Sequence, residues 1–67
     1  MANTKEKLGK RVQKLRKGLG YTQEAMAEKL HISRTHMGHI EQGRKSPSLK
    51  LMDKLARALK VKVSELF

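Results

Sequence analysis

The apolar positions of this chain recur three or four residues apart over two stretches, a spacing that gathers side chains onto one face of a helix. The first stretch covers residues 5–17, and its apolar positions are Leu8, Val12 and Leu15. The second covers residues 49–59, and its apolar positions are Met52, Leu55, Ala56 and Leu59. Gly18 and Gly20 follow the first stretch, and Pro47 precedes the second. The pattern therefore predicts two amphipathic helices with marked boundaries.

Between these helices, residues 23–42 read as two shorter helices joined by a tight turn at His31 and Ile32. Their inward-facing positions are Met26, Ala27 and Leu30 in the first helix and Met37 and Ile40 in the second. Thr22 and Ser33 precede the two helices, and both residue types are favourable N-caps. The second helix presents a short, polar, donor-rich side to the outside. The spacing predicts a helical hairpin over about residues 22–42.

A short apolar segment closes the chain after Gly43, a basic loop and the second long helix. Its apolar residues are Val61, Val63, Leu66 and Phe67, and Ser64 is a candidate cap for a last helical turn. A length of 67 residues leaves little room for a second core. We therefore expect one domain over residues 1–67, all-α, with five short helices around a compact core.

The charge balance of the chain indicates which classes of partner it favours. Sixteen Lys and Arg against six Asp and Glu give a formal net charge of +10, which favours binding to phosphate backbones or anionic lipids. Only one Tyr, one Phe and no Trp are present, so the chain lacks the aromatic platforms on which single-stranded nucleic acids stack. Double-stranded DNA is the better partner.

Composition and residue spacing argue against several other classes of protein. The absence of Cys removes disulfides and thiolate metal sites, and no apolar run is long enough to span a bilayer, so we expect a cytoplasmic protein. His36 and His39 stand at i and i+3 and could reach one ion, but no Cys or third carboxylate lies close by in sequence. No nucleophile–base pair with an implied pocket is present. We expect no metal, no cofactor and no enzymatic activity.

The central segment resembles a known family. Gln23, Ala27, Leu30, Ile32, Met37 and Ile40 stand at the spacings of the lambda-repressor-like, Cro-type (XRE) helix-turn-helix family. The flanks TQEAMAEKL, IEQGRKSPSL and LARALKVKVSELF resemble the family in the same register, so the resemblance covers roughly residues 8–67. Three positions depart from the pattern. His31 and Lys60 stand where the family usually has Gly, and Gly38 lies inside the second helix of the hairpin.

The resemblance implies which residues touch DNA. In the family, the second helix of the hairpin lies in the major groove with its N-terminal half against base edges. The positions that match the base-reading ones are Arg34, Thr35 and His39, with His36 at the edge of the contact. The positions that match phosphate contacts are Thr22, Gln23, Gln42, Arg44, Lys45 and Ser46. Plain solvent exposure is the alternative for the loop residues, and N-capping is the stronger role for Thr22.

Two structural expectations follow from the same resemblance. Arg16 and Glu41 match an ion pair that joins the first helix to the end of the base-reading helix. The family usually forms twofold dimers near its last helix, where Val61, Val63, Leu66 and Phe67 are the candidates. Core packing is the alternative role for Val61 and Leu66.

The implied function is a sequence-specific transcriptional regulator, usually a repressor, that binds a pseudo-palindromic operator as a homodimer. Compact phage-type repressors and restriction-modification controllers have this size. An antitoxin-like module, with a protein as its main partner and DNA as a secondary one, is the alternative. A basic membrane-surface peptide is a third class, disfavoured because the short, capped helices predict folding without lipid.

Overall fold

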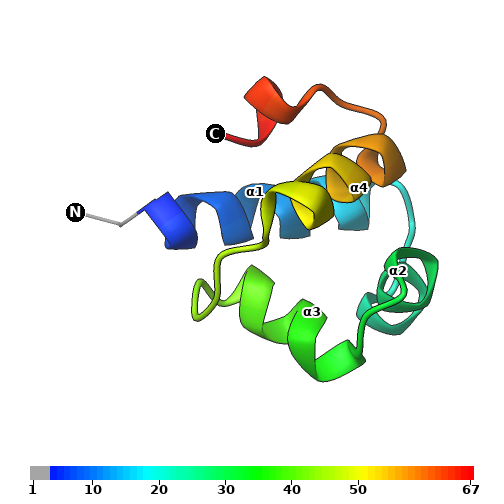
Figure 1. Cartoon of the computed structure of the whole chain (residues 1–67). Coiled ribbons are helices and arrows are strands. Elements are labelled where there is room, and N and C mark those ends of the chain that lie inside the picture. The colour runs from blue at the N-terminus through cyan, green and yellow to red at the C-terminus, as the bar shows by residue number, and fades with distance from the viewer. Residues whose placement is uncertain (1–3) are drawn as a thin grey trace.

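The computed structural model describes residues 4–67, which form four α-helices and one 3-10 turn. The helices are α1 (Thr4–Gly18), α2 (Gln23–Leu30), α3 (Arg34–Glu41) and α4 (Leu49–Leu59), and the turn is η1 (Val63–Leu66). In Figure 1, α1 and α4 cross the middle of the molecule, α3 lies below them and η1 lies above. The side that carries α3 is therefore opposite the side that carries η1.

Hydroxyl side chains start three of the helices. The backbone N–H groups of Ala25, His36 and Leu51 donate to the side-chain oxygens of Thr22, Ser33 and Ser48 over 3.0, 2.9 and 3.1 Å. Each bond satisfies an N–H group that has no partner inside its own helix. The predicted caps Thr22 and Ser33 are confirmed, and Ser48 adds a third after Pro47.

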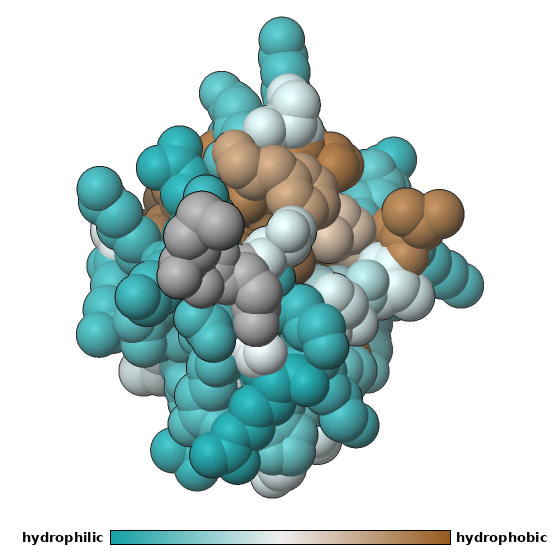
Figure 2. Space-filling view, turned by 90° about the vertical axis from the view of Figure 1, so that its left-hand side faces the viewer, coloured by the Kyte–Doolittle hydropathy of each residue, from teal (hydrophilic) through white to brown (hydrophobic). Residues whose placement is uncertain are grey.

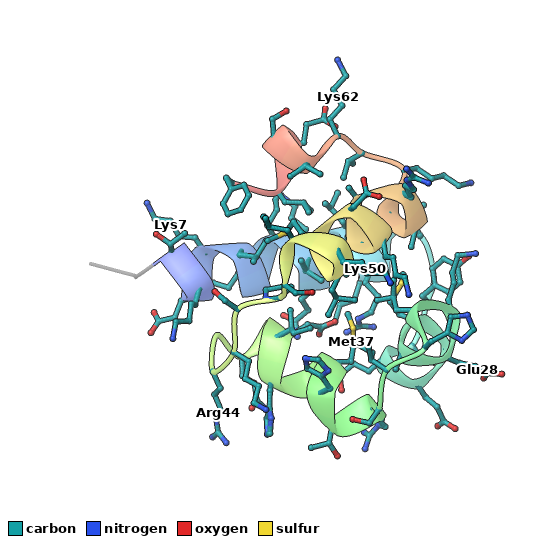
Figure 3. The ribbon with its side chains drawn as sticks, viewed as in Figure 1. Lys7, Glu28, Met37, Arg44, Lys50 and Lys62 are labelled. Atoms are coloured by element: carbon teal, nitrogen blue, oxygen red, sulfur yellow. The ribbon has the colours of Figure 1, made fainter. Side chains whose placement is uncertain are left out.

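The apolar faces of the helices meet in one core. Six side chains are completely or almost completely shielded from water: Met26, Met37, Ile40, Leu55, Leu66 and Val12. Leu15, Tyr21, Ile32 and Val61 are half-buried and pack against this core. Figure 3 shows Met37 pointing from α3 toward the centre of the molecule. The described residues form helices and one 3-10 turn and no strand, so the predicted all-α class is confirmed.

The prediction of a fifth helix is corrected at the end of the chain. Residues Val63–Leu66 form a single 3-10 turn that follows the extended backbone of Lys62. The predicted cap Ser64 lies inside this turn, and the backbone N–H of Lys62 donates instead to Glu65 Oε2 at 2.7 Å. Arg11 Nε donates to the carbonyl oxygen of Glu65 at 3.1 Å, which ties the turn to α1. Leu19, which directly follows α1, has an exposed side chain.

Two helices end on residues other than glycine in the left-handed region. His31 has φ 59° and ψ 42°, and Lys60 has φ 61° and ψ 38°. The N–H of Ile32 donates to the carbonyl oxygen of Ala27 at 3.0 Å, and Val61 makes the matching bond to Ala56. Both ends have the hydrogen bonds of a Schellman motif, in which glycine is the favoured residue. Side-chain crowding makes this backbone unfavourable for histidine and lysine by about 1 kcal/mol each.

We therefore expect His31→Gly to stabilise the protein by about 1 kcal/mol, because glycine adopts φ 59° without side-chain crowding. Urea unfolding followed by far-ultraviolet circular dichroism measures the change. Gln42→Gly is the matched control, because Gln42 ends α3 at φ −83° and the same substitution there relieves no strain. A stability gain in the control equal to that of His31→Gly would refute the strain argument.

Candidate nucleic-acid interface

The polar side of α3 is the candidate surface for base reading. Arg34 and Thr35 lie in its first turn and are exposed, and the half-buried His39 follows one turn after Thr35 on the same side. Among the described residues, no hydrogen bond or ion pair holds the side chain of Arg34. Arg34 and Thr35 thus offer free donors at the N-terminal end of α3, where the sequence placed base reading.

His36 is oriented differently from these residues. It is half-buried and is the one α3 residue that lines a hollow between α2 and α4, together with side chains of those two helices and of the turn that precedes α3. Its backbone N–H is used by the Ser33 cap at 2.9 Å. The structure thus places His36 at the border of the polar side of α3, between that side and α4.

The loop after α3 carries four of the predicted phosphate-binding residues. They are all exposed: Gln42, Arg44, Lys45 and Ser46. Figure 3 shows Arg44 at the end of α3, pointing away from the molecule. In the part of the chain that the structure describes, neither Arg44 nor Lys45 takes part in an ion pair. The charged groups of Arg44 and Lys45 are therefore available for a partner outside the described residues.

The two remaining phosphate candidates lie at the start of α2, and both have partners within the protein. Thr22 Oγ1 accepts from the N–H of Ala25, and Gln23 Nε2 donates to Glu41 Oε1 at 3.0 Å. Gln23 is half-buried against α3. Its amide therefore holds the end of α3, while the first backbone N–H groups of α2 remain directed outward, as at any helix N-terminus.

A buried ion pair fixes the end of α3 to α1. Arg16 Nε donates to Glu41 Oε2 at 2.6 Å, and Arg16 Nη2 donates to Glu41 Oε1 at 3.0 Å. The remaining terminal nitrogen, Arg16 Nη1, donates to the carbonyl oxygen of Tyr21 at 2.6 Å. The side chains of Arg16 and Glu41 are only 7% and 1% exposed. Together with Gln23, these bonds join α1, α2 and α3 at one carboxylate.

Glycines allow α1 to lie directly against the end of α3. A Cβ atom at Gly9 would stand 2.5 Å from the carbonyl oxygens of both Ile40 and Glu41. At Gly43, which has φ +76°, a Cβ atom would stand 2.8 Å from Glu6 Cγ. Any side chain at either position would push α1 away from α3. The position of α3 therefore depends on close backbone contact as well as on the ion pair.

The structure also shows which features the residue pattern did not reveal. Gly9 is buried, yet an isolated glycine within a helical pattern gives no sign of what approaches it. Leu49 stands three residues before Met52, on the apolar spacing of α4, but it is 90% exposed. Leu51 and Met52 of the same turn are buried, so the spacing alone did not show which of these side chains faces the core.

Metal binding and membrane spanning find no support in the described residues. No group of three His, Cys, Asp or Glu side chains in that part of the chain is arranged to hold a metal ion. No helix of residues 4–67 has both the length and the apolar character needed to cross a membrane.

Comparison with known proteins gives a consistent result. The HTH_3 family, described as helix-turn-helix, matches residues 12–66. The immunity repressor protein of Bacillus phage phi105 is 39% identical over 57 residues, which are 85% of this chain but only 40% of that protein. The restriction-modification controller protein C.AhdI from Aeromonas hydrophila has a crystal structure that superposes with a TM-score of 0.87 at 37% identity, covering 92% of this chain and 94% of that one.

A further structure contains DNA. The biofilm master regulator SinR, solved in complex with DNA, superposes with a TM-score of 0.82 at 30% identity, covering 88% of this chain and 95% of that one. The family match spans α2, α3 and the loop that follows them, which are the elements of the candidate interface. The resemblance to the lambda-repressor-like, Cro-type group is thereby confirmed, and the chain belongs to the HTH_3 helix-turn-helix family.

Proposed function

We propose that this chain is a sequence-specific transcriptional regulator, acting as a repressor, in which α3 enters the major groove of double-stranded DNA. The observation that carries the proposal is the side chain of Arg34, which is exposed in the first turn of α3 and has no partner among residues 4–67. The other end of α3 is held by the ion pair of Glu41 with Arg16. A guanidinium in that position can donate two hydrogen bonds to O6 and N7 of a guanine. The function is binding alone, exerted by one domain and without a catalytic step.

The proposed contacts divide into base reading and backbone positioning. Arg34, Thr35 and His39 share the polar side of α3, and we assign base reading to them, with His36 at its border. The N-terminus of α2 and the exposed loop 42–46 lie on either side of α3 in sequence and supply amide and cationic donors for phosphates. Phosphate contacts fix the register of the protein on DNA, and base contacts select the sequence.

Arg34→Ala should relax the preference for one base pair in each half of the operator and leave the fold intact. The loss of a bidentate contact to guanine corresponds to about 1–3 kcal/mol of discrimination, or roughly tenfold to a hundredfold in specific affinity. Selection from randomised duplexes at physiological salt, performed with both proteins, measures the change. A selected consensus identical to that of the unchanged protein would contradict the role of Arg34.

Lys45→Ala is the matched contrast in the same selection, because Lys45 is exposed in the loop and is assigned to a phosphate. We expect it to weaken binding to all duplexes to a similar extent, to leave the consensus unchanged and to reduce the salt dependence by about one counterion. An altered consensus would exclude a pure phosphate contact.

We further propose that the regulator acts as a homodimer on a pseudo-palindromic operator. Val63 and Phe67 support this proposal, because they are 38% and 67% exposed, whereas Leu66 is buried and Val61 packs against the core. In Figure 2, apolar groups gather in the upper half of a face whose lower half is hydrophilic. A twofold contact there would leave α3 of each subunit free for DNA, since η1 lies on the opposite side of the molecule from α3 (Figure 1).

Replacement of Phe67 by Asp should weaken self-association, because a charge would be buried at the proposed contact. Sedimentation equilibrium over a range of concentrations measures the dimer constant, and we expect an increase of at least about tenfold in Kd. Leu19→Asp is the control, since Leu19 is also exposed but lies between α1 and α2. An equal effect of both substitutions would place the dimer contact elsewhere.

A further inference from the structure

A groove with a basic rim and an apolar floor runs between α2 and α4. Two adjoining hollows form it, and they share Leu30, His31 and Lys54. The basic side chains that line it are Lys29, His31, His36, Lys50, Lys54 and Arg57, which we call the basic rim. No Asp or Glu lines either hollow, although Asp53 lies nearby as the exposed ion-pair partner of Arg57 at 3.2 Å.

The floor of this groove distinguishes it from an ordinary basic surface. Leu30, Ile32, Leu51 and Ala58 line the two hollows between the basic side chains. Ile32 is half-buried, whereas Leu30, Leu51 and Ala58 are buried and border the groove with only a small exposed fraction. A DNA backbone is recognised by cations and amide groups and gains little from an apolar floor. The combination fits a ligand that has both carboxylates and apolar side chains.

The spacing of the rim suggests the form of this ligand. Lys50, Lys54 and Arg57 stand at i, i+4 and i+7 on one side of α4 and therefore form a row of about 10 Å along the helix. A second helix lying along α4 with acidic residues at the same spacing would meet this row, and its neighbouring apolar residues would cover the floor. Helices bind grooves of this kind through anchors at such spacing.

We infer that the groove between α2 and α4 is a docking site for an acidic amphipathic helix of a partner protein. The site is distinct from the polar side of α3, because none of Arg34, Thr35 and His39 lines either hollow. Only His36 belongs to both regions. A partner helix bound there would add a negatively charged element beside the DNA-binding surface and would change the affinity for DNA by repulsion of phosphates.

The test uses the whole chain labelled with ¹⁵N and a synthetic helical peptide that carries glutamates at i, i+4 and i+7 and leucines on the adjacent face. A control peptide has the leucines replaced by serine and the same charge. At physiological salt, we expect the first peptide to shift the amide resonances of Leu30, Ile32, Leu51 and Ala58 and the control peptide to bind about tenfold more weakly. Equal binding of both peptides, or shifts spread over α1 and the loop 42–46, would overturn the inference.

A pair of variants distinguishes binding in the groove from general electrostatic attraction of the peptide to a basic protein. Lys54→Glu changes the lysine that lines both hollows, whereas Lys10→Glu changes an exposed lysine of α1 and alters the net charge equally. We expect Lys54→Glu to weaken peptide binding about tenfold and Lys10→Glu to weaken it by less than about threefold. If double-stranded DNA shifts the floor resonances and Lys54→Glu weakens DNA binding as much as Lys45→Ala does, the groove belongs to the DNA interface and the inference is wrong.

Discussion

Arg16→Met should destabilise the protein by about 3–5 kcal/mol, because it leaves the carboxylate of Glu41 buried without its charged partner. Methionine keeps most of the apolar stem of Arg16, so the loss reports the ionic contacts rather than an empty space. Gln23 still donates one hydrogen bond to Glu41 Oε1, but a neutral amide does not replace a bidentate guanidinium. A small domain without disulfides has few kcal/mol in reserve, so we expect the variant to be largely unfolded at 25 °C.

Thermal and urea unfolding with circular dichroism measure this effect, and the chain contains its own control. Arg57 forms an ion pair with Asp53 whose side chains are 81% and 56% exposed. Arg57→Met therefore removes a pair of the same chemistry in water, and we expect a change within about 0.5 kcal/mol. Similar losses in both variants would show that burial of the Arg16–Glu41 pair does not determine its contribution.

Gly9→Ala should cost about 2 kcal/mol or more, which is the reverse of the usual effect of alanine within a helix. Helix propensity alone would favour alanine by about 1 kcal/mol. The added Cβ, however, would stand 2.5 Å from two backbone carbonyl oxygens of α3, and neither oxygen can move without displacing that helix. Steric repulsion between α1 and α3 therefore outweighs the gain in propensity. The free energy of unfolding from urea titration measures the difference.

Gly18→Ala is the matched control for this substitution, because Gly18 also belongs to α1 and no atom lies within 4 Å of the added Cβ. We expect it to be neutral or to stabilise the protein by up to about 0.5 kcal/mol. Changes of opposite sign in the free energy of unfolding would distinguish the effect of close contact between helices from the effect of helix propensity. A gain in both would mean that α1 adjusts its position without cost.

The two variants also differ in their expected effect on DNA binding, measured where the protein is still folded. Gly9→Ala pushes α1 and the carboxyl end of α3 apart, so it should lower specific DNA affinity as well as stability. Gly18→Ala leaves α3 untouched and should leave the affinity unchanged.

Residue spacing was sufficient to predict the helices of this chain. Three-to-four-residue periodicity located α4 at residues 49–59 and α1 within one residue of its bounds, and hydroxyl residues marked the starts of α2 and α3. Local signals carry this information, because each helix depends on its own apolar face and caps. The last element was overestimated, since the apolar residues of the closing segment also fit a single turn that packs Leu66 into the core.

Long-range contacts are what the spacing did not reveal. Three features depend on how separate helices pack: the close approach of α3 carbonyl oxygens to Gly9, the hydrogen bond that Arg16 Nη1 donates to the carbonyl oxygen of Tyr21, and the hollows between α2 and α4. The pairing of Arg16 with Glu41 was foreseen only through a resemblance to other proteins. The identity of the DNA contacts likewise depends on a partner that sequence spacing does not represent, and they remain predictions.

The hydrogen bonds around Glu41 also affect how freely the protein can change over generations. Glu41 anchors α3 at its carboxyl end, and the side chains assigned to base reading at the other end, Arg34 and Thr35, contribute nothing to that anchor. We therefore expect substitutions at Arg34 and Thr35 to leave stability nearly unchanged and, on the proposed assignment, to alter the DNA sequence that is preferred. On the same assignment, a lineage carrying this scaffold would acquire new operators by single replacements, without a compensating change elsewhere in the fold.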